Sequence, residues 1–318
     1  MYTAGFTNNV QWCPRGTVFL LDKIKRRKNV MDKKELIKLL NKLNFPKDEY
    51  YILSSGCLLL YGLRDQASDL DLCISEDLFN QIKIKYNLIE ENKNHCGFYP
   101  LQGENVEVVV DSKSEFCMEE KDGYNVQNLY KLLVDKKKRN LPKDQKDIEN
   151  IEKYLEKNKI EYRDLYDQNK IATGKTFRRG KTVPNGYYML TVISIIENLD
   201  GRYLIQKSSD KKGSDWASTG GHPKAGENSK QGIIQEIKEE LGIDVSHEKM
   251  DLIETVKTKD DFIDLYYIKM NIDLNKIVIQ KDEVQEVKLV TKNELQKMIS
   301  DKNFRNSHMK MFEIFWNR

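Results

Sequence analysis

One stretch of the sequence decides the fold of its second half: Gly221-His-Pro-Lys-Ala-Gly-Glu227, seven further residues, and Gln235-Glu-Ile-Lys-Glu-Glu-Leu-Gly-Ile243. Within it, Glu236, Glu239 and Glu240 have the i, i+3, i+4 spacing that places three carboxylates on one face of a helix. Three hard oxygen ligands on one face are what Mg²⁺ or Mn²⁺ requires when it also binds a diphosphate. The spacing therefore predicts a metal-binding helix.

A solvated acidic helix face is the alternative interpretation, and three glutamates alone would favour it. The residues around the three glutamates favour the metal-binding interpretation instead. Gly220 and Gly221 precede the helix, where the lack of a side chain lets the backbone approach the carboxylates. The same segment supplies an apolar face for burial, which predicts a helix over residues 229–241: Ile233, Ile234, Ile237 and Leu241.

The full stretch, from Gly221 to Ile243, resembles the conserved box of the Nudix family. That pattern reads Gly, five residues, Glu, seven residues, Arg-Glu, an aliphatic residue, any residue, Glu-Glu, any residue, Gly and an aliphatic residue. Every fixed position agrees except one, because Gln235 stands where the family has Arg. A glutamine can form hydrogen bonds but carries no charge, so we expect the difference to affect the rate more than metal binding.

The resemblance implies roles for the matching positions. Glu236, Glu239 and Glu240 would bind Mg²⁺ or Mn²⁺, and one of them would orient or deprotonate the attacking water. Gly220 or Gly221 would add a backbone carbonyl ligand. The implied reaction is cleavage of a diphosphate bond in a small molecule such as a nucleoside diphosphate derivative.

Further residues near the box are candidates for the same site. The resemblance implies that Glu227 steadies the junction of loop and helix, and Gly242 completes the box. His222 lies in the loop beside the predicted metal site and is placed to contact a phosphate. Glu283 and Glu286 occupy a position where the family often has another acid, a metal ligand or a base; a solvated turn before a strand is the alternative.

Residues 162–300 also resemble the Nudix subgroup related to isopentenyl-diphosphate isomerase. The matching segments are Asp164-Leu-Tyr-Asp167, Thr173-Gly-Lys-Thr176, Arg178-Arg-Gly180 and Trp216-Ala-Ser-Thr-Gly-Gly-His-Pro223. The isomerases use a catalytic Cys just before the His-Pro of this loop, whereas no Cys follows Cys117 in this chain. The sequence therefore favours hydrolysis over isomerisation. Arg178 and Arg179 either meet a substrate phosphate or lie on a solvated strand edge.

The first half carries a second acidic motif, Asp69-Leu-Asp71, downstream of Ser55-Gly56. Both acids of an Asp-x-Asp strand project from the same side, where they can hold Mg²⁺ against a nucleoside triphosphate. The arrangement resembles the nucleotidyltransferase fold, in which a Gly-Ser or Gly-Gly turn precedes Asp-x-Asp. Glu107 is the candidate for the third carboxylate, and Asp111 is the alternative.

Two other features bear on this second motif. Lys136-Lys-Lys-Arg139 and Pro142-Lys-Asp-Gln-Lys-Asp147 resemble the tail of such domains, whereas Ser55 replaces the first glycine of the turn. The alternative is a degenerate domain that binds a nucleotide without transferring it, or that binds nothing.

The length of the chain suggests two domains. We expect an N-terminal extension over residues 1–30, a nucleotidyltransferase-like domain over 31–157 and a Nudix domain over 158–318. The fold class is α/β (α+β): a nucleotidyltransferase-like α/β domain followed by an α/β/α sandwich. A capping box of Thr291 and Glu294 predicts the start of the final helix.

Composition narrows the choice of partners. The 53 basic and 50 acidic residues leave a net charge of +3, which is typical of solvated helix faces and not of a nucleic-acid footprint. No apolar run approaches the length of a membrane span, and the first residues lack the basic-then-apolar plan of a signal peptide, so we expect a cytoplasmic protein. Five cysteines without a CxxC pair speak against disulfides and a zinc site.

The expected partners are a small-molecule diphosphate and, at the first domain, a nucleoside triphosphate, with neither nucleic acid nor membrane. The sequence leaves the oligomeric state open. His95, His247 and His308 are expected on the surface.

Overall fold

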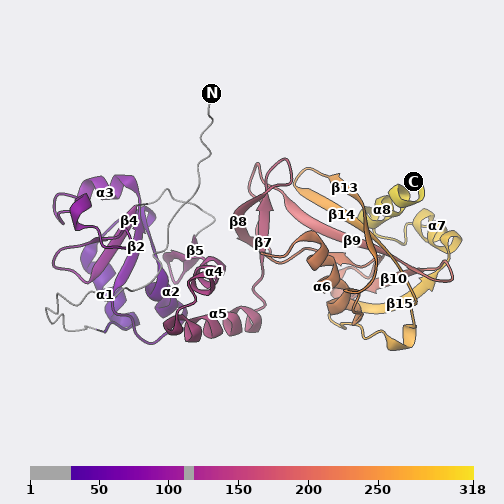
Figure 1. The fold of residues 1–318 in the computed structure, drawn as a ribbon, viewed down its shortest axis with the longest axis horizontal. Helices are drawn as coiled ribbons and strands as arrows, with labels where there is room; N and C mark the ends of the chain where they lie inside the picture. The colour runs from indigo at the N-terminus through magenta and orange to yellow at the C-terminus, as the bar shows by residue number, and fades with distance from the viewer. Residues whose placement is uncertain (1–29, 111–117) are drawn as a thin grey trace, which may run out of the picture. The chain divides into compact units, whose positions relative to one another are not determined.

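The computed structural model describes residues 30–110 and 118–318, and it divides the chain into two compact units at Ile160 and Glu161. Each unit combines helices with strands, so the mixed α/β class expected from the sequence is confirmed (Figure 1). The expected extension lies outside the described residues except at residue 30, and so does Asp111.

The first unit is built on a six-stranded sheet with the order β3-β4-β2-β1-β6-β5. Its strands are β1 (Tyr50–Ile52), β2 (Leu70–Ile74), β3 (Tyr99–Pro100), β4 (Val106–Val110), β5 (Met118–Lys121) and β6 (Tyr124–Gln127). Strand β2 runs parallel to β4 and antiparallel to β1. The parallel pairing places Asp71 directly opposite Glu107.

Within the described residues of this unit, five α-helices pack around the sheet through a core of apolar side chains. They are α1 (Lys33–Leu43), α2 (Ser54–Tyr61), α3 (Glu76–Ile82), α4 (Leu129–Arg139) and α5 (Gln145–Lys157). Asp32 begins α1 with a capping box, because its side chain and that of Glu35 each accept a hydrogen bond from the other's backbone N–H.

The second unit contains a seven-stranded sheet whose main path is β11-β10-β9-β14-β13, with β12 paired to β9 and β15 paired to β10. Its strands are β9 (Met189–Asn198), β10 (Tyr203–Ser208), β11 (Trp216–Ala217), β12 (Gly220–Gly221), β13 (Met250–Lys257), β14 (Asp261–Met270) and β15 (Val284–Val290). A separate hairpin joins β7 (Tyr162–Tyr166) to β8 (Ala172–Arg178). The α-helices of this unit are α6 (Ser229–Leu241), α7 (Lys292–Ser300) and α8 (Asn306–Trp316).

Helices cover both faces of the seven-stranded sheet (Figure 1). Val192 and Ile196 of β9 belong to the core under α6, whereas Ile193 and Ile195 belong to the core under α7 and α8. Successive side chains of a strand project to opposite faces, so one strand supplies both cores. The unit therefore consists of three layers, helix, sheet and helix.

Some expectations about single elements need correction. The capping box of Thr291 and Glu294 begins α7 as predicted, but α7 is not the last helix because α8 follows it. The β5–β6 and β7–β8 hairpins were not predicted. Among residues 30–110 and 118–318, every helix is too short or too polar to traverse a bilayer.

The expectation that His308 lies on the surface is wrong. His308 is only 5% exposed in α8, and its Nδ1 lies 2.9 Å from the hydroxyl oxygen of Ser218. Burial, with a smaller contribution from the charge of Arg305, lowers the pKa of His308 to about 3. The folded protein therefore holds this imidazole in its neutral form.

The buried imidazole predicts a specific loss of stability in acid. Between its ordinary pKa of 6.5 and about 3, the unfolded chain binds a proton at His308 that the folded chain does not. The free energy of unfolding should therefore fall as pH decreases, by up to about 1.4 kcal/mol per pH unit from this residue. His308→Gln removes this contribution, so in urea denaturation the gap between wild type and variant should narrow from about pH 7 to about pH 5. A gap independent of pH would contradict the assignment.

Candidate functional site

The carboxylate of Glu236 stands against the backbone of the loop that precedes α6. Its Oε1 accepts a hydrogen bond from the backbone N–H of His222 at 3.1 Å. A Cβ added to Gly221 would lie 2.3 Å from this carboxylate, and one added to Gly220 would lie 2.4 Å from the carbonyl oxygen of Val192. Both positions require glycine because the loop passes closer to its neighbours than a side chain would allow.

The other two glutamates of α6 have different surroundings. Glu239 is exposed, and its Oε1 accepts hydrogen bonds from Lys224 Nζ at 2.7 Å and from Gln235 Nε2 at 2.6 Å. Glu240 is buried, and its Oε2 accepts a hydrogen bond from Gln206 Nε2 at 2.7 Å. Glu236 thus contacts the loop before α6, Glu239 lies at the surface, and Glu240 faces the interior.

Burial and neighbouring negative charge both act on Glu236. Burial, followed by the charge of Glu239 and with a smaller contribution from Glu283, raises the pKa of Glu236 to about 7, while the hydrogen bond from His222 opposes the shift. Glu283 directly precedes β15, so the fold brings a residue distant in sequence within electrostatic range of α6. Glu286, the other acid singled out there, is exposed on β15 opposite Lys207.

The loop and the end of α6 are held by contacts of their own. Glu227 Oε2 accepts a hydrogen bond from the backbone N–H of Lys224 at 2.8 Å, which closes the turn before the helix. Asp164 of β7 accepts another from the backbone N–H of Gly226 at 2.8 Å. Gly242 ends α6 in the left-handed conformation, with φ of 69°.

Two arginines from the β7–β8 hairpin segment lie within electrostatic range of Glu236: Arg163 in β7 and Arg179 just after β8. Arg179 also pairs with Glu161 at 2.6 Å. Sequence reasoning singled out Arg179 but missed Arg163. The hairpin register, which pairs Arg163 with Phe177, would have been needed to find it.

The donor set of α6 suits a hard divalent cation. Within the described residues, no three His, Cys, Asp or Glu side chains are gathered closely enough to hold a metal ion as they stand. Glu236 and Glu239 nevertheless lie one turn apart near Glu283, and all their donors are carboxylate oxygens. A cation would offset both the burial and the repulsion that raise the pKa of Glu236, so these residues fit Mg²⁺ or Mn²⁺.

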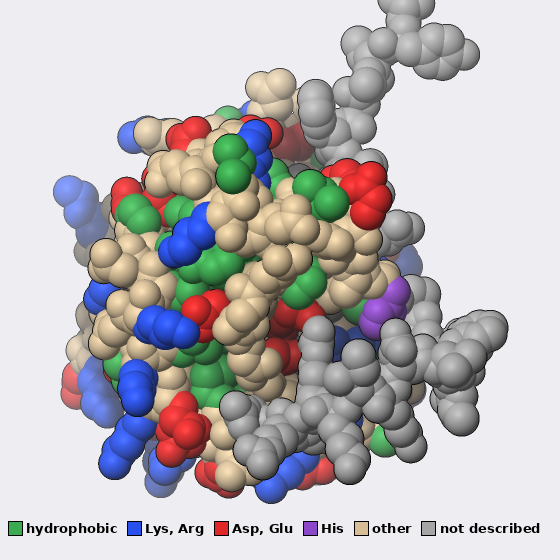
Figure 2. Space-filling model, turned by 90° about the vertical axis from the view of Figure 1, so that its left-hand side faces the viewer, with side chains coloured by type: hydrophobic (Ala, Val, Ile, Leu, Met, Phe, Trp, Pro, Cys, Tyr) green, Lys and Arg blue, Asp and Glu red, His purple; other side chains and the backbone are tan. Residues whose placement is uncertain are grey.

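The first unit gathers its acidic motif at one cavity of about 490 Å³. Four of the five predicted residues line it: Ser55, Asp69, Asp71 and Glu107. Gly56 does not, because it faces the core, where an added Cβ would lie 2.8 Å from Ile52 Cγ2. On the face of this unit drawn in Figure 2, acidic side chains are visible in a hollow, with lysines and arginines elsewhere on the same face.

Asp71 is the most perturbed acid of this cavity. Burial, followed by the charges of Asp69 and Glu107, raises the pKa of Asp71 to about 7, while Arg139 and Lys143 oppose the shift. Helix α2 also begins at the cavity and has no side-chain cap at its N-terminus. Such a helix end is suited to a phosphate group.

The tail that follows α4 forms a network of ion pairs beside the same cavity. Lys136, which is 2% exposed, pairs with Asp144 at 3.2 Å and with Asp147 at 2.9 Å. Arg139 donates two hydrogen bonds to Asp144, at 2.8 and 2.6 Å, and Arg64 pairs with Asp147 at 3.0 Å. Asp144 and Asp147 thus hold three cationic side chains in place at the edge of the acidic cavity: Lys136, Arg139 and Arg64.

Comparison with known proteins identifies relatives of the second unit. The family model described as NUDIX domain matches residues 187–313. The uncharacterized Nudix hydrolase lmo0368 of Listeria monocytogenes is 34% identical over 145 residues, which are 44% of this chain and 86% of that protein. The uncharacterized Nudix hydrolase lin0387 of Listeria innocua is 35% identical over 147 residues, with shares of 44% and 86%.

Solved structures resemble the same region at lower identity. The structure of DR0079 from Deinococcus radiodurans is 14% identical with a TM-score of 0.42, and the match covers 49% of this chain and 99% of that chain. The NUDIX domain of Shewanella oneidensis NrtR, solved with ADP ribose, is 17% identical with a TM-score of 0.35, covering 41% and 88%.

The close approach of Gly221 to Glu236 predicts the effect of a small substitution. In Gly221→Ala the new methyl group overlaps the carboxylate 2.3 Å away, so the loop or Glu236 must move. We expect the free energy of unfolding to fall by about 1–3 kcal/mol in urea denaturation. The double variant Gly221→Ala with Glu236→Ala lacks the overlapping carboxylate and should regain most of the loss. A fully stable Gly221→Ala protein would show that the approach is wrong.

Proposed function

Because this chain belongs to the Nudix hydrolase family through its second unit, we propose that this unit hydrolyses a diphosphate bond in a nucleoside diphosphate derivative or a similar small molecule. The observation that carries the proposal is the packing of the Glu236 carboxylate against the Gly220–Gly221 backbone, beside Glu239 and within range of Glu283. This arrangement concentrates oxygen ligands beside strand β12, where a diphosphate with its metal ion would be bound.

Each part of the proposed site has a distinct task. Glu236, Glu239 and Glu240 are the residues that would hold Mg²⁺ or Mn²⁺, and Gly220 would add a backbone carbonyl. Such a cation neutralises the diphosphate and makes a bound water more acidic. One carboxylate of α6 would take the proton of the attacking water, and Lys224, which contacts Glu239, would neutralise a phosphate oxygen.

Removing one carboxylate charge at a time tests this assignment. Glu239→Gln and Glu240→Gln keep the side-chain shape, so the fold should survive while metal-dependent hydrolysis falls on the order of 100-fold or more. The measurement is release of phosphate or nucleoside monophosphate from a panel of nucleoside diphosphate derivatives with Mg²⁺ and with Mn²⁺. The control is Glu254→Gln, at an exposed position of β13, which should retain wild-type activity. Wild-type activity in Glu240→Gln would refute its role.

A second candidate function is favoured by the acidic cavity of the first unit. We propose that residues 31–157 bind a nucleoside triphosphate with Mg²⁺, in the manner of a nucleotidyltransferase. Asp69, Asp71 and Glu107 line one cavity, and α2 begins at its wall. Arg139 and Lys143 also line this cavity and supply positive charge for the phosphates.

Thermal unfolding of the full chain tests the second candidate. A nucleoside triphosphate with Mg²⁺ should raise the melting temperature, because ligand at about one hundred times its dissociation constant stabilises the folded state by about 2.7 kcal/mol. Asp69→Asn with Asp71→Asn should abolish this nucleotide-dependent gain, whatever its effect on the protein without nucleotide. The control is Asp48→Asn with Asp77→Asn, two exposed acids outside the cavity. An equal gain in both double variants would refute binding at this cavity.

A further inference from the structure

A groove of about 620 Å³ runs along α5 in the first unit, and we call it the lysine groove. Its cationic lining residues are Arg64, Lys143, Lys146, Lys153 and Lys157. Only two acids line it, Asp65 and Asp147, and Asp147 is already paired with Arg64 and Lys136. The groove is therefore positive in a chain whose total charge is only +3.

The charges of α5 are segregated between its faces. Its three glutamates lie outside the groove: Glu149, Glu152 and Glu156. Within the described part of the chain, none of the four groove lysines has an ion-pair partner. A solvated helix face normally intersperses the two signs, so a face on which positive charges predominate is suited to a negatively charged ligand.

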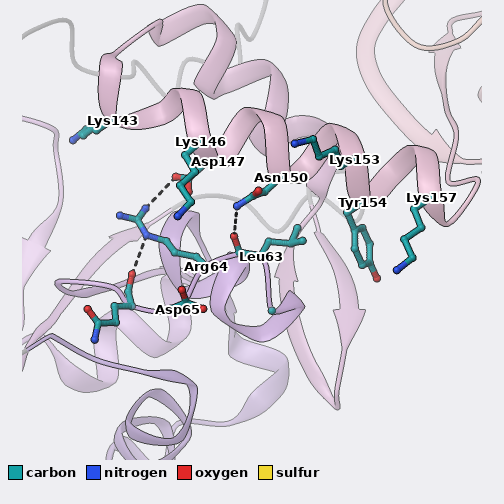
Figure 3. A pocket seen from close by; sticks show the side chains of 12 residues that line it. Leu63, Arg64, Asp65, Lys143, Lys146, Asp147, Asn150, Lys153, Tyr154 and Lys157 are labelled. Atoms are coloured by element: carbon teal, nitrogen blue, oxygen red, sulfur yellow. Dashed lines mark hydrogen bonds and ion pairs between the residues drawn. The ribbon is translucent and has the colours of Figure 1, made fainter.

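The groove lysines are strung along the helix and do not converge on one point (Figure 3). From Lys143 to Lys157 the chain advances on the order of 20 Å at about 1.5 Å per helical residue. One isolated phosphate would meet one or two of these cations, whereas a chain of phosphates would meet all of them. The geometry thus fits an extended polyanion.

An aromatic side chain completes the lining. Tyr154 lies between Lys153 and Lys157 on the wall of the groove and is partly exposed. Its ring packs edge-on against Tyr61 at 5.4 Å between centroids, which fixes its orientation. A positive groove with a fixed aromatic ring is the combination that binds single-stranded nucleic acid, since the ring stacks a base while lysines contact the backbone.

We propose that the lysine groove binds a single-stranded segment of nucleic acid, with its phosphates along the α5 lysines and a base against Tyr154. Arg64 and Lys143 line both this groove and the acidic cavity, so a bound strand would have one end beside Asp69 and Asp71. The net charge of the whole chain is close to zero and therefore does not indicate a nucleic-acid partner. It sums the charges on both faces of every helix, so it does not reveal a locally positive groove. Binding of the strand requires neither hydrolysis at the second unit nor nucleotidyl transfer at the first. A negative result in the binding experiment would therefore leave both proposed functions untouched.

The experiment measures binding of the full chain to a fluorescent single-stranded oligonucleotide of about ten nucleotides by anisotropy. Lys146→Gln with Lys153→Gln should weaken binding about 10-fold or more at moderate salt. It should also make the slope of log affinity against log salt shallower by about 1.4, since each phosphate contact contributes about 0.7. Lys34→Gln with Lys38→Gln on α1 removes the same charge away from the groove and should leave affinity within about twofold.

Two outcomes would overturn the proposal. Equal losses in the two double variants would show that binding is not localised to the groove. Displacement of the oligonucleotide by tripolyphosphate at equal phosphate concentration would assign the groove to a small polyphosphate instead. Chemical acetylation of the wild-type protein supplies a test without substitutions: the oligonucleotide should protect Lys146 and Lys153 but not Lys34 and Lys38, and the absence of such protection would also refute it.

Discussion

The enclosure of carboxylates beside one another is the constraint on which both candidate sites depend. Asp71 in the first unit and Glu236 in the second are each partly buried beside other acids, and burial together with these charges raises the pKa of each to about 7. An isolated strand or helix would not hold such groups together, because their charged forms gain by separating. The packing of helices on both sheets keeps them in place, at a cost that a bound divalent cation would offset.

The two units place positive charge near these acids in different ways. In the first unit, Lys136 and Arg139 form ion pairs with Asp144, which follows α4 and is not one of the predicted metal ligands. In the second, Lys224 contacts Glu239 of the candidate site directly. In the first unit the cations are thus paired with acids outside the predicted metal-binding set, whereas in the second Lys224 would have to move or to share Glu239 if a metal ion were bound there.

Helix α6 illustrates what could be predicted from sequence. Its apolar positions, its glutamates and Gly242 together predict the helix from residue 229 to residue 241, and those are its observed ends. The β7–β8 hairpin was missed because its strands are short, largely polar and only partly buried, so they lack a clear alternation of apolar residues. That omission hid Arg163, which the hairpin brings within range of Glu236.

The sequence by itself determined the Nudix box, the spacing of its acids and the presence of a second acidic motif. Only the tertiary structure decided that Gly56 packs in the core, that Glu240 turns to Gln206 in the interior, and that Glu283 joins the charge around Glu236. The reason is physical. Local periodicity determines the side of its own helix or strand from which a residue projects, whereas the element that lies on that side is chosen by the packing of distant segments.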